Sequence, residues 1–552
     1  MHPHLPPVLS RPTGRAVRRA AATATAVLAA LTATAGTALA ATTAAPSPSP
    51  AADGPLLPAA SAQPGLGALA TTAPTAAPAD PTGGGLGHLG FATLSVSAAV
   101  VLVAVALLAV AGTTLWWMLH AWWTPQSLER TKFNRDVTTP RHSFSLLVPA
   151  RHEELVLGDT LDALAAMDHP DFEVVAIIGH DDPDTHAVAV AAAQRHPGVV
   201  RVVVDHSVPK NKPKALNTAL ATCEKDVVGV FDAEDEVHPD LLRLVDGRFT
   251  ETSADVVQGG VQLMNIHSSW WSMRNCLEYY FWFRSRLHFH ANRQFIPLGG
   301  NTVFTRTELL IEHGGWDAEC LAEDCEIGVR LSTRGARIAV AYDPAVVTRE
   351  ETPGTLRSLV KQRTRWDQGF LQVLRKGEWR KLPTRSQRLL ARFTLSMPFL
   401  QAFSGLLVPV AVVLALFAKV PTPIAFVSFA PLALLVLSVV VDIVGLHEFG
   451  HVFHQKIRLR DDVRLVLGVF PYQLLLAFAA LRSVWREKRG QTGWEKTEHA
   501  NVHRQPGDVP ATSTPPSTAA SAVTAGRPLP VGAVALAATT PDRESARVGV
   551  DA

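Results

Sequence analysis

Three short groups of chemically active residues follow one another between residues 232 and 366. They are, in order, Asp232-Ala-Glu234-Asp235, Ala322-Glu323-Asp324 and Gln362-Arg-Thr-Arg365-Trp366. Two carboxylates one residue apart at the end of a strand can share a hard divalent cation with the oxygens of a diphosphate. A further carboxylate within hydrogen-bond reach of a hydroxyl can act as its base. The order therefore indicates metal-assisted chemistry on a substrate that carries a diphosphate.

Each group also has a purely structural explanation. The first could be a solvated acidic turn that caps a helix starting near His238, and Asp324 could cap the helix that follows it. The third group occupies one face of a helix, at positions i, i+3 and i+4, so Trp366 could simply be a partly buried side chain near a membrane. The fixed order of the three groups favours the functional interpretation.

Short apolar runs alternate with helical patterns from residue 143 to residue 232. The predicted strands cover 143–149, 174–178, 199–204 and 226–232, and the predicted helices cover 154–167, 186–195 and 214–223. Continuous apolar strands that alternate with helices indicate an α/β fold with a mostly parallel sheet covered on both faces. In such sheets, ligands bind beyond the carboxyl ends of the strands.

Polar residues follow the predicted strands at those positions. The first strand leads into the segment Pro149–Glu153, the second into Asp181 and Asp182, and the fourth into the first acidic group. Lys212 and Lys214 precede a helix and could oppose the charge of a diphosphate. A solvated basic loop explains these lysines equally well, and a solvated acidic turn is an alternative for the two aspartates.

Together these residues resemble glycosyltransferase family 2, in particular its membrane-embedded, cellulose-synthase-like branch. Further motifs that carry the resemblance are Lys212-Pro-Lys-Ala-Leu-Asn217, Gly299-Gly-Asn-Thr-Val-Phe304 and Gly315-Trp-Asp317. The resemblance covers roughly residues 143–500. It implies a GT-A-like nucleotide-sugar-binding domain flanked by transmembrane helices, an inverting hexosyltransferase reaction, and Mg²⁺ or Mn²⁺ as the cofactor.

The resemblance also implies a role for each candidate residue. Asp324 would be the general base. Donor contacts would come from Pro149, Glu153, Asp181, Asp182, Lys214, Gln362 and Arg365. Acceptor contacts would come from Trp366 and Glu323. The metal ligands would be Asp232 with either Glu234 or Asp235, because this chain has a glutamate where the Asp-x-Asp motif of the family usually has its second aspartate.

Four apolar runs, at 93–118, 398–418, 423–446 and 462–481, are each long enough to cross about 30 Å of hydrocarbon as a helix. Basic residues after the first run place the following domain in the cytoplasm, against a plasma membrane. The last run contains Pro471 and is the best candidate for an interfacial helix. The expected order is a signal peptide or weak first membrane helix (1–41), a disordered extracytoplasmic linker (42–90), a transmembrane helix (91–121), the cytoplasmic glycosyltransferase domain (125–390), transmembrane and interfacial helices (391–485), a basic segment (486–504) and a disordered tail (505–552).

The composition of the chain limits which partners and which kinds of site are expected. The net charge of +2 argues against a nucleic-acid partner. The four cysteines form no zinc-type pair, so reduced thiols are expected. The aromatic segment 267–290 suits either the membrane interface, which we favour, or the faces of sugar rings.

The expected donor is a nucleotide-diphosphate sugar, in particular a UDP-sugar, and the expected acceptor is a growing polysaccharide. A glycolipid acceptor, or transfer of one sugar to a lipid carrier, is the alternative within the same chemistry. His447-Glu-Phe-Gly-His451 also matches the H-E-x-x-H pattern of membrane zinc metalloproteases, although no third ligand follows at the usual spacing. A non-catalytic polysaccharide-export scaffold would lack the base or the donor carboxylates, and this chain has both.

Overall fold

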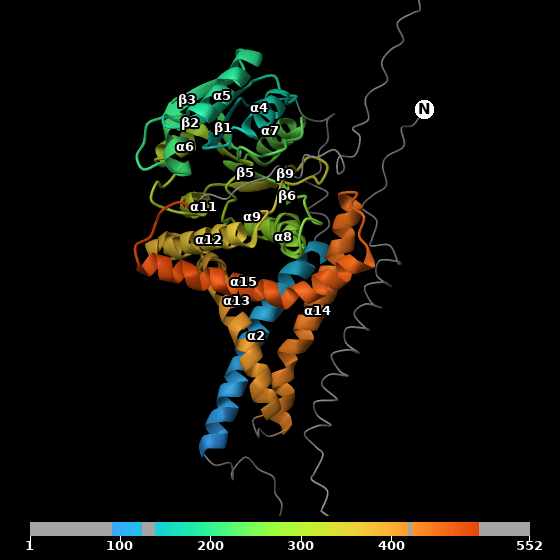
Figure 1. Cartoon of the computed structure of the whole chain (residues 1–552). Coiled ribbons are helices and arrows are strands. Elements are labelled where there is room, and N and C mark those ends of the chain that lie inside the picture. Colours follow the sequence, from blue (N-terminus) through green and yellow to red (C-terminus); the bar gives the residue numbers. More distant parts are fainter. Residues whose placement is uncertain (1–90, 124–138, 418–421, 496–552) are drawn as a thin grey trace, which may run out of the picture. The chain divides into compact units, whose positions relative to one another are not determined.

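The computed structural model describes residues 91–123, 139–417 and 422–495 (Figure 1). The segments predicted as signal peptide, linker and tail lie outside the described residues. The strands are β1 (Phe144–Ala150), β2 (Phe172–Gly179), β3 (Val200–Asp205), β4 (Val227–Val230), β5 (Val256–Gly259), β6 (Val261–Leu263), β7 (Val303–Arg306), β8 (Ile338–Ala341) and β9 (Thr348–Glu350). The helices are α2 (Phe91–Trp123), α4 (Leu157–Ala165), α5 (Pro183–Arg195), α6 (Lys212–Leu220), α7 (Leu241–Thr252), α8 (Trp270–Phe281), the π-helical turn η2 (Trp282–Arg286), α9 (Leu287–Asn292), α10 (Thr307–Glu312), α11 (Glu323–Thr333), α12 (Leu356–Lys376), the 3₁₀ turn η3 (Glu378–Lys381), α13 (Arg385–Phe417), α14 (Thr422–Val452) and α15 (Leu459–Lys488).

The central sheet has seven strands in the order β3-β2-β1-β4-β7-β5-β8. β1 pairs in parallel with β2 and β4, and β2 pairs in parallel with β3. Only β7 breaks this direction within the sheet, running antiparallel between β4 and β5. The structure therefore confirms the predicted mostly parallel α/β sheet, with four predicted strands close to β1, β2, β3 and β4.

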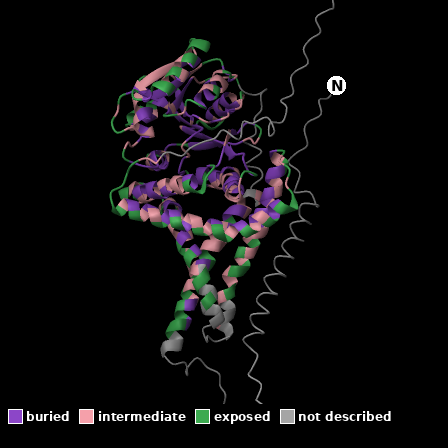
Figure 2. Ribbon diagram, in the orientation of Figure 1, coloured by how far each residue is buried: buried purple, intermediate pink, exposed green. Residues whose placement is uncertain are grey.

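The strands are continuously apolar because both faces of the sheet are covered (Figure 2). Leu147 and Ile177 point to one face and pack in the cluster that contains residues of α6, α8 and α11. Leu146 and Val148 point to the other face and pack with residues of α4, α5 and α7. This two-sided burial leaves the carboxyl ends of the strands as the open edge.

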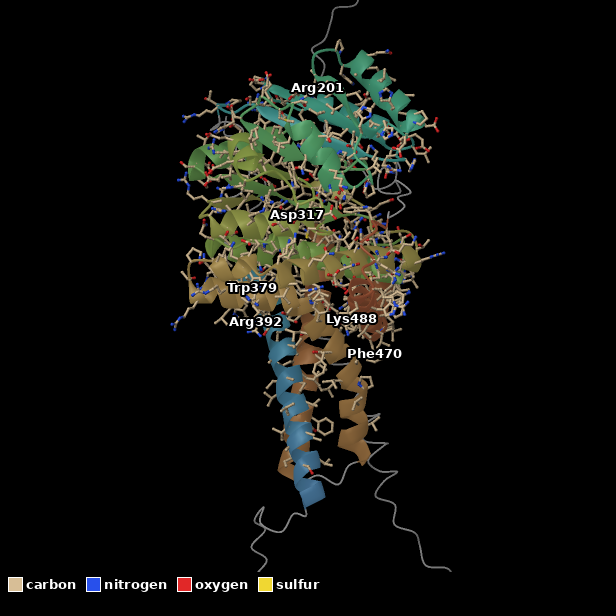
Figure 3. All side chains as sticks on the ribbon, turned by 90° about the vertical axis from the view of Figure 1, so that its left-hand side faces the viewer. Arg201, Asp317, Trp379, Arg392, Phe470 and Lys488 are labelled. Atoms are coloured by element: carbon tan, nitrogen blue, oxygen red, sulfur yellow. The ribbon has the colours of Figure 1, made fainter. Side chains whose placement is uncertain are left out.

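Three described helices contain stretches that are long and apolar enough to cross a membrane, Ser95–His120, Ser428–Val452 and Leu459–Lys488. The remaining predicted run, 398–418, begins inside α13, which contains Pro398 and Pro409. α15 also makes polar contacts with α12, where the Gln368 side chain accepts a hydrogen bond from Arg486 at 3.0 Å. Figure 3 shows two basic residues of these helices, Arg392 of α13 and Lys488 of α15.

Candidate active site

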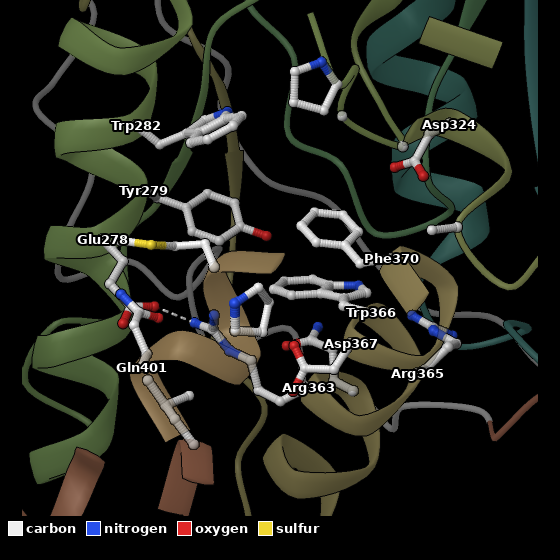
Figure 4. Close-up of a pocket in the computed structure, with 18 of the residues that line it drawn as sticks. Glu278, Tyr279, Trp282, Asp324, Arg363, Arg365, Trp366, Asp367, Phe370 and Gln401 are labelled. Carbon is white, nitrogen blue, oxygen red and sulfur yellow. Dashed lines mark hydrogen bonds and ion pairs between the residues drawn. The ribbon is translucent and has the colours of Figure 1, made fainter. Parts of the chain in front are cut away.

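A cavity of about 1170 Å³ begins among the loops at the carboxyl ends of β1, β3 and β4. It continues past the segment that precedes α11 and along α12, and then runs between α2, α13, α14 and α15. Figure 4 shows part of it, with Tyr279 and Trp282 on one side, Trp366 and Phe370 on another, and Asp324 facing the same space. The cavity thus joins the open edge of the sheet to the long helices.

Predicted donor residues line the end of the cavity next to the sheet. Pro149 lies at the carboxyl end of β1 and Glu153 follows it, and Asp232 and Glu234 follow β4. Burial, followed by the charges of Asp232 and Glu153, raises the pKa of Glu234 to about 8. Carboxylates that are crowded in this way favour a bound cation, which would remove their mutual repulsion.

Lys210 and Lys212 line the cavity, whereas the predicted Lys214 does not. The Asn211 side chain caps α6 by accepting a hydrogen bond from the Lys214 backbone at 3.0 Å, so Lys212 is the first residue of the helix. The Lys212 Nζ forms an ion pair with Asp232 and donates to the Gly300 carbonyl at 2.8 Å. The Lys214 Nζ instead donates to the Pro209 carbonyl at 3.2 Å, and Lys214 itself does not line the cavity.

Asp235 is fully buried and is not among the residues that line the cavity. Its carboxylate accepts hydrogen bonds from the Asp232 backbone at 2.9 Å and from the Asn301 amide at 3.0 Å. The side chain therefore holds the turn that presents Asp232 and Glu234. Of the metal ligands left open by the sequence, the geometry favours these two.

The donor set fits a hard divalent cation, since Asp232 and Glu234 both present carboxylate oxygens to the cavity. The described residues contain no group of three or more His, Cys, Asp or Glu side chains placed to hold a metal ion. A cation bound here would thus need other oxygens, such as those of a diphosphate, to complete its coordination. Mg²⁺ in nucleotide-dependent enzymes is commonly held in this way, by one or two carboxylates and by substrate phosphates.

Asp181 and Asp182 follow β2 but do not line the cavity. Asp182 is the N-cap of α5, and its carboxylate also accepts a hydrogen bond from the His152 backbone at 2.6 Å. Asp181 is ion-paired with Arg151 at 3.0 Å. Both aspartates therefore act on the loop after β1, whose residues Arg151 and His152 do line the cavity.

Asp324 and Glu323 lie in the first turn of α11 and line the cavity. The N-cap of this helix is Ala322 rather than Asp324, although the Asp324 carboxylate accepts a hydrogen bond from the Cys325 backbone at 2.7 Å. Burial raises the pKa of Asp324, and burial together with the charge of Asp324 raises the pKa of Glu323 to about 8. A carboxylate with a raised pKa is a stronger base once it is deprotonated.

α12 is seated directly on the turn that carries these two acids. A side-chain Cβ at Gly369 would lie 2.5 Å from the backbone nitrogen of Ala322, so only glycine permits this approach. The Thr355 hydroxyl caps the start of the helix by accepting a hydrogen bond from the Ser358 backbone at 3.1 Å. The close packing fixes α12 relative to Asp324.

The third sequence group lies along the cavity wall as predicted, with Gln362, Arg365 and Trp366 all lining it. The Arg365 guanidinium lies over the Trp494 ring at 4.2 Å, and burial lowers its pKa. No ion pair joins Arg365 to a carboxylate among the described residues. The Trp366 ring is 6.4 Å from that of Tyr279, so two aromatic rings flank this part of the space.

Part of the aromatic segment 267–290 contributes to the cavity. Tyr279, Trp282 and Phe283 line the cavity, whereas Trp270, Trp271 and Phe289 do not. Arg363 reaches this segment from α12 and forms an ion pair with Glu278 (Figure 4). The sequence signal was the density of aromatic residues, since ring faces suit sugars as well as membrane interfaces.

The H-E-x-x-H segment is engaged in structural contacts. His447 lies 3.0 Å from Asp462, and Glu448 is ion-paired with Arg284 and accepts a hydrogen bond from the Trp122 indole at 3.0 Å. Glu448 is therefore not available as a base. With no three-ligand group in the described part of the chain, the metalloprotease alternative has no structural support.

Residues 140–369 match the family model described as "Glycosyltransferase like family 2". The chain is 29% identical over 243 residues to a β-monoglucosyldiacylglycerol synthase of Synechocystis, a match that covers 43% of this chain and 49% of the relative. It is 24% identical over 251 residues to a poly-β-1,6-N-acetyl-D-glucosamine synthase of Staphylococcus epidermidis, covering 44% and 58%. The chain thus spans about half the length of the curated relatives it matches.

Among solved structures, the chain is similar to the mannosyltransferase PcManGT of Pyrobaculum calidifontis in complex with GDP-Man and Mn²⁺. The identity is 20% and the TM-score is 0.48, and the match covers 70% of this chain and 99% of that one.

Proposed function

We propose a reaction for this protein, a glycosyltransferase whose residues 140–369 form a family 2 domain. The reaction is the inverting transfer of a sugar from a UDP-sugar to an acceptor hydroxyl at a membrane, assisted by Mg²⁺ or Mn²⁺. The observation that carries the proposal is that the carboxylates, the cations and the aromatic rings predicted from three separate sequence groups line the same cavity.

The donor lies at the sheet end of the cavity, where its diphosphate meets Lys212 and Arg365. Both side chains are partly buried, and the guanidinium of Arg365 has no carboxylate ion pair among the described residues. A divalent cation held by Asp232 and Glu234 would neutralise the charge that develops on the leaving diphosphate. Pro149 and Glu153 form the wall beside the nucleoside, and Asp181 and Asp182 support that loop from behind.

Asp324 acts as the base. As the acceptor oxygen forms its bond to the anomeric carbon, its proton passes to the Asp324 carboxylate. The bond between the anomeric carbon and the diphosphate breaks, and its electron pair leaves with the diphosphate. A single displacement of this kind inverts the anomeric configuration. Glu323 and Trp366 contact the acceptor, and the indole ring offers its face to a sugar or a similar apolar surface.

Several features support a membrane location with the catalytic domain on the cytoplasmic side. The long helices carry exposed apolar side chains such as Leu102, Val105 and Phe429, with 72%, 55% and 46% of their surface exposed. Exposed apolar residues of this density on three candidate spans suit contact with lipid. Arg392 and Lys488, on the long helices α13 and α15, add basic charge at the sheet end of this region.

The proposal is tested with purified full-length protein, a panel of radiolabelled UDP-sugars and GDP-mannose, and either Mg²⁺ or Mn²⁺. We expect one donor to be consumed, and Asp324→Asn to reduce kcat by about 10²- to 10⁴-fold, because the base is lost. Glu319→Gln, which removes an exposed carboxylate just before α11, is the control and should keep full activity. An Asp324→Asn variant as active as the wild type, or a protein that consumes no donor, would refute the proposal.

A further inference from the structure

Two of the arginines that line the cavity lack a carboxylate partner. Arg151 pairs with Asp181, Arg274 with Asp442, and Arg363 with Glu278. Arg365 and Arg286 have no such ion pair among the described residues. In the proposed reaction the donor diphosphate is the anionic partner of Arg365, but no step involves Arg286.

Arg286 ends the π-helical turn η2 and lies between two indole rings. Its guanidinium is 5.0 Å from the ring centre of Trp117, on α2, and 5.1 Å from that of Trp282. Its Nε is buried without a hydrogen-bond partner, and so is the indole nitrogen of Trp117 beside it. Burial lowers the pKa of Arg286 to about 10, with no neighbouring acid to oppose the change.

A buried charge without a counter-charge is costly, and hydrogen-bond donors without acceptors add to that cost. The neighbouring Arg284, on the same turn, shows the usual solution, because it is ion-paired with Glu448. Arg286 lines the cavity and Arg284 does not. The counter-charge of Arg286 is therefore expected to come from whatever occupies the cavity.

The cavity beyond the catalytic groups is largely apolar where the long helices form it. Its walls there include Leu107, Val110, Leu432, Leu435, Val469 and Leu476, with isolated serine and glutamine side chains between them. A sugar polymer would leave most of its hydroxyls without partners against such a wall. A hydrocarbon chain would match it.

We propose that the acceptor is a phosphate-bearing amphiphile, whose phosphate binds Arg286 and whose apolar chain lies between the long helices. A guanidinium presents paired N–H donors that match phosphate oxygens, and the flanking indole rings suit the boundary between a headgroup and its chain. This assignment rests on the proposed function, and it replaces the growing polysaccharide with a membrane lipid as the acceptor.

Three probes separate the parts of such an acceptor. Dioleoylphosphatidylglycerol has a chain, a phosphate and free hydroxyls, dioleoylglycerol lacks the phosphate, and sn-glycerol 3-phosphate lacks the chains. Binding of each to the full-length protein in detergent is measured by native mass spectrometry. Transfer of label from the donor sugar to each probe is measured in parallel.

For the wild type we expect phosphatidylglycerol to bind about tenfold more tightly than dioleoylglycerol, the scale of one charge-assisted contact. Glycerol phosphate should bind more weakly than either. Arg286→Gln should abolish the preference for the phosphate-bearing lipid, and Arg286→Lys should keep part of it. Arg293→Gln, which removes an arginine outside the cavity lining, is the matched control and should leave the preference unchanged.

Equal binding of the two lipids by the wild type, or an intact preference in Arg286→Gln, would overturn the inference. So would a glycerol phosphate affinity equal to that of the lipid, since it would remove the need for the apolar wall. If no donor turns over but the lipid preference depends on Arg286, the proposed function fails and the anion site remains. If a donor turns over without any lipid preference, only this inference fails.

Discussion

Charged side chains are compensated differently at the two ends of the cavity. At the sheet end, Asp232, Glu234, Glu323 and Asp324 are opposed only in part by Lys212 and Arg365. At the helix end, partly buried arginines are paired one to one with carboxylates of distant segments, as Arg274 is with Asp442. Arg286 is the exception there. We infer that a substrate supplies the opposite charge at each place where the protein's own side chains do not.

The sign of the uncompensated charge distinguishes the residues assigned to the donor from those assigned to the acceptor. The sheet end carries an excess of acids with raised pKa values, which a divalent cation would relieve. The helix end carries an excess cation, which an anion would relieve. Substitutions at one end should therefore change one substrate's binding and leave the other's intact.

Removal of a metal ligand at the sheet end should have the largest effect on donor kinetics. Asp232→Asn and Glu234→Gln are each expected to lower kcat/KM for the donor by about 10²- to 10³-fold, because the leaving diphosphate loses its cation. Titration with Mn²⁺ should show a weaker dependence in both variants, while binding of the lipid probes stays unchanged. Asp184→Asn, an exposed acid on α5, serves as the control. Wild-type rates with unchanged metal dependence would contradict the assignment of these two ligands.

Arg365→Gln should have the next largest effect. We expect kcat/KM for the donor to fall about 10- to 100-fold, the scale of one or two hydrogen bonds to a charged group, because the diphosphate loses its unpaired arginine. The preference for phosphate-bearing lipid should persist, which is the opposite of the result expected for Arg286→Gln.

Steady-state kinetics at varied donor, combined with the lipid titration, measures both quantities for Arg365→Gln. Arg375→Gln provides the matched comparison, since this residue lies on the same helix, pairs with Glu487 at 2.7 Å and does not line the cavity. If Arg365→Gln also lost the preference for phosphate-bearing lipid, Arg365 and Arg286 would belong to one anion site, and the assignment of two separate sites would be wrong.

The sheet end could be predicted from sequence because its signals are local. Strands buried on both faces are continuously apolar, and functional residues follow them within a few positions. The choice between Lys212 and Lys214 is also set by neighbouring residues, but the apolar pattern does not show it. It depended on Asn211 as the cap of α6, which sets where the helix begins and which lysine turns toward the cavity.

The helix end could not be predicted in the same way, because its defining contacts join residues far apart in the chain. Arg274 and Asp442 are separated by 168 positions, and Arg363 and Glu278 by 85. No periodicity connects such pairs. The aromatic segment was visible in the sequence, but whether its rings faced lipid or a cavity depended on how α12 and α2 packed against it.

The smallest effect is expected at Asp235, the third candidate for the metal site. The sequence could not separate Asp235 from Glu234, and the two differ in the structure only by which way the turn directs each carboxylate. Asp235 accepts its hydrogen bonds from the Asp232 backbone and the Asn301 amide, and it lies outside the cavity lining.

Asn has the shape of Asp and keeps an oxygen for the Asp232 backbone N–H, so Asp235→Asn should hold the turn in place. We expect kcat/KM within about threefold of the wild type, an unchanged Mn²⁺ dependence, and a melting temperature lowered by a few degrees, since one buried hydrogen bond changes. Asp235→Ala leaves the Asp232 N–H without its acceptor and should lower the melting temperature further. A loss in Asp235→Asn as large as in Asp232→Asn, together with altered metal dependence, would instead make Asp235 the second metal ligand and leave Glu234 as its neighbour.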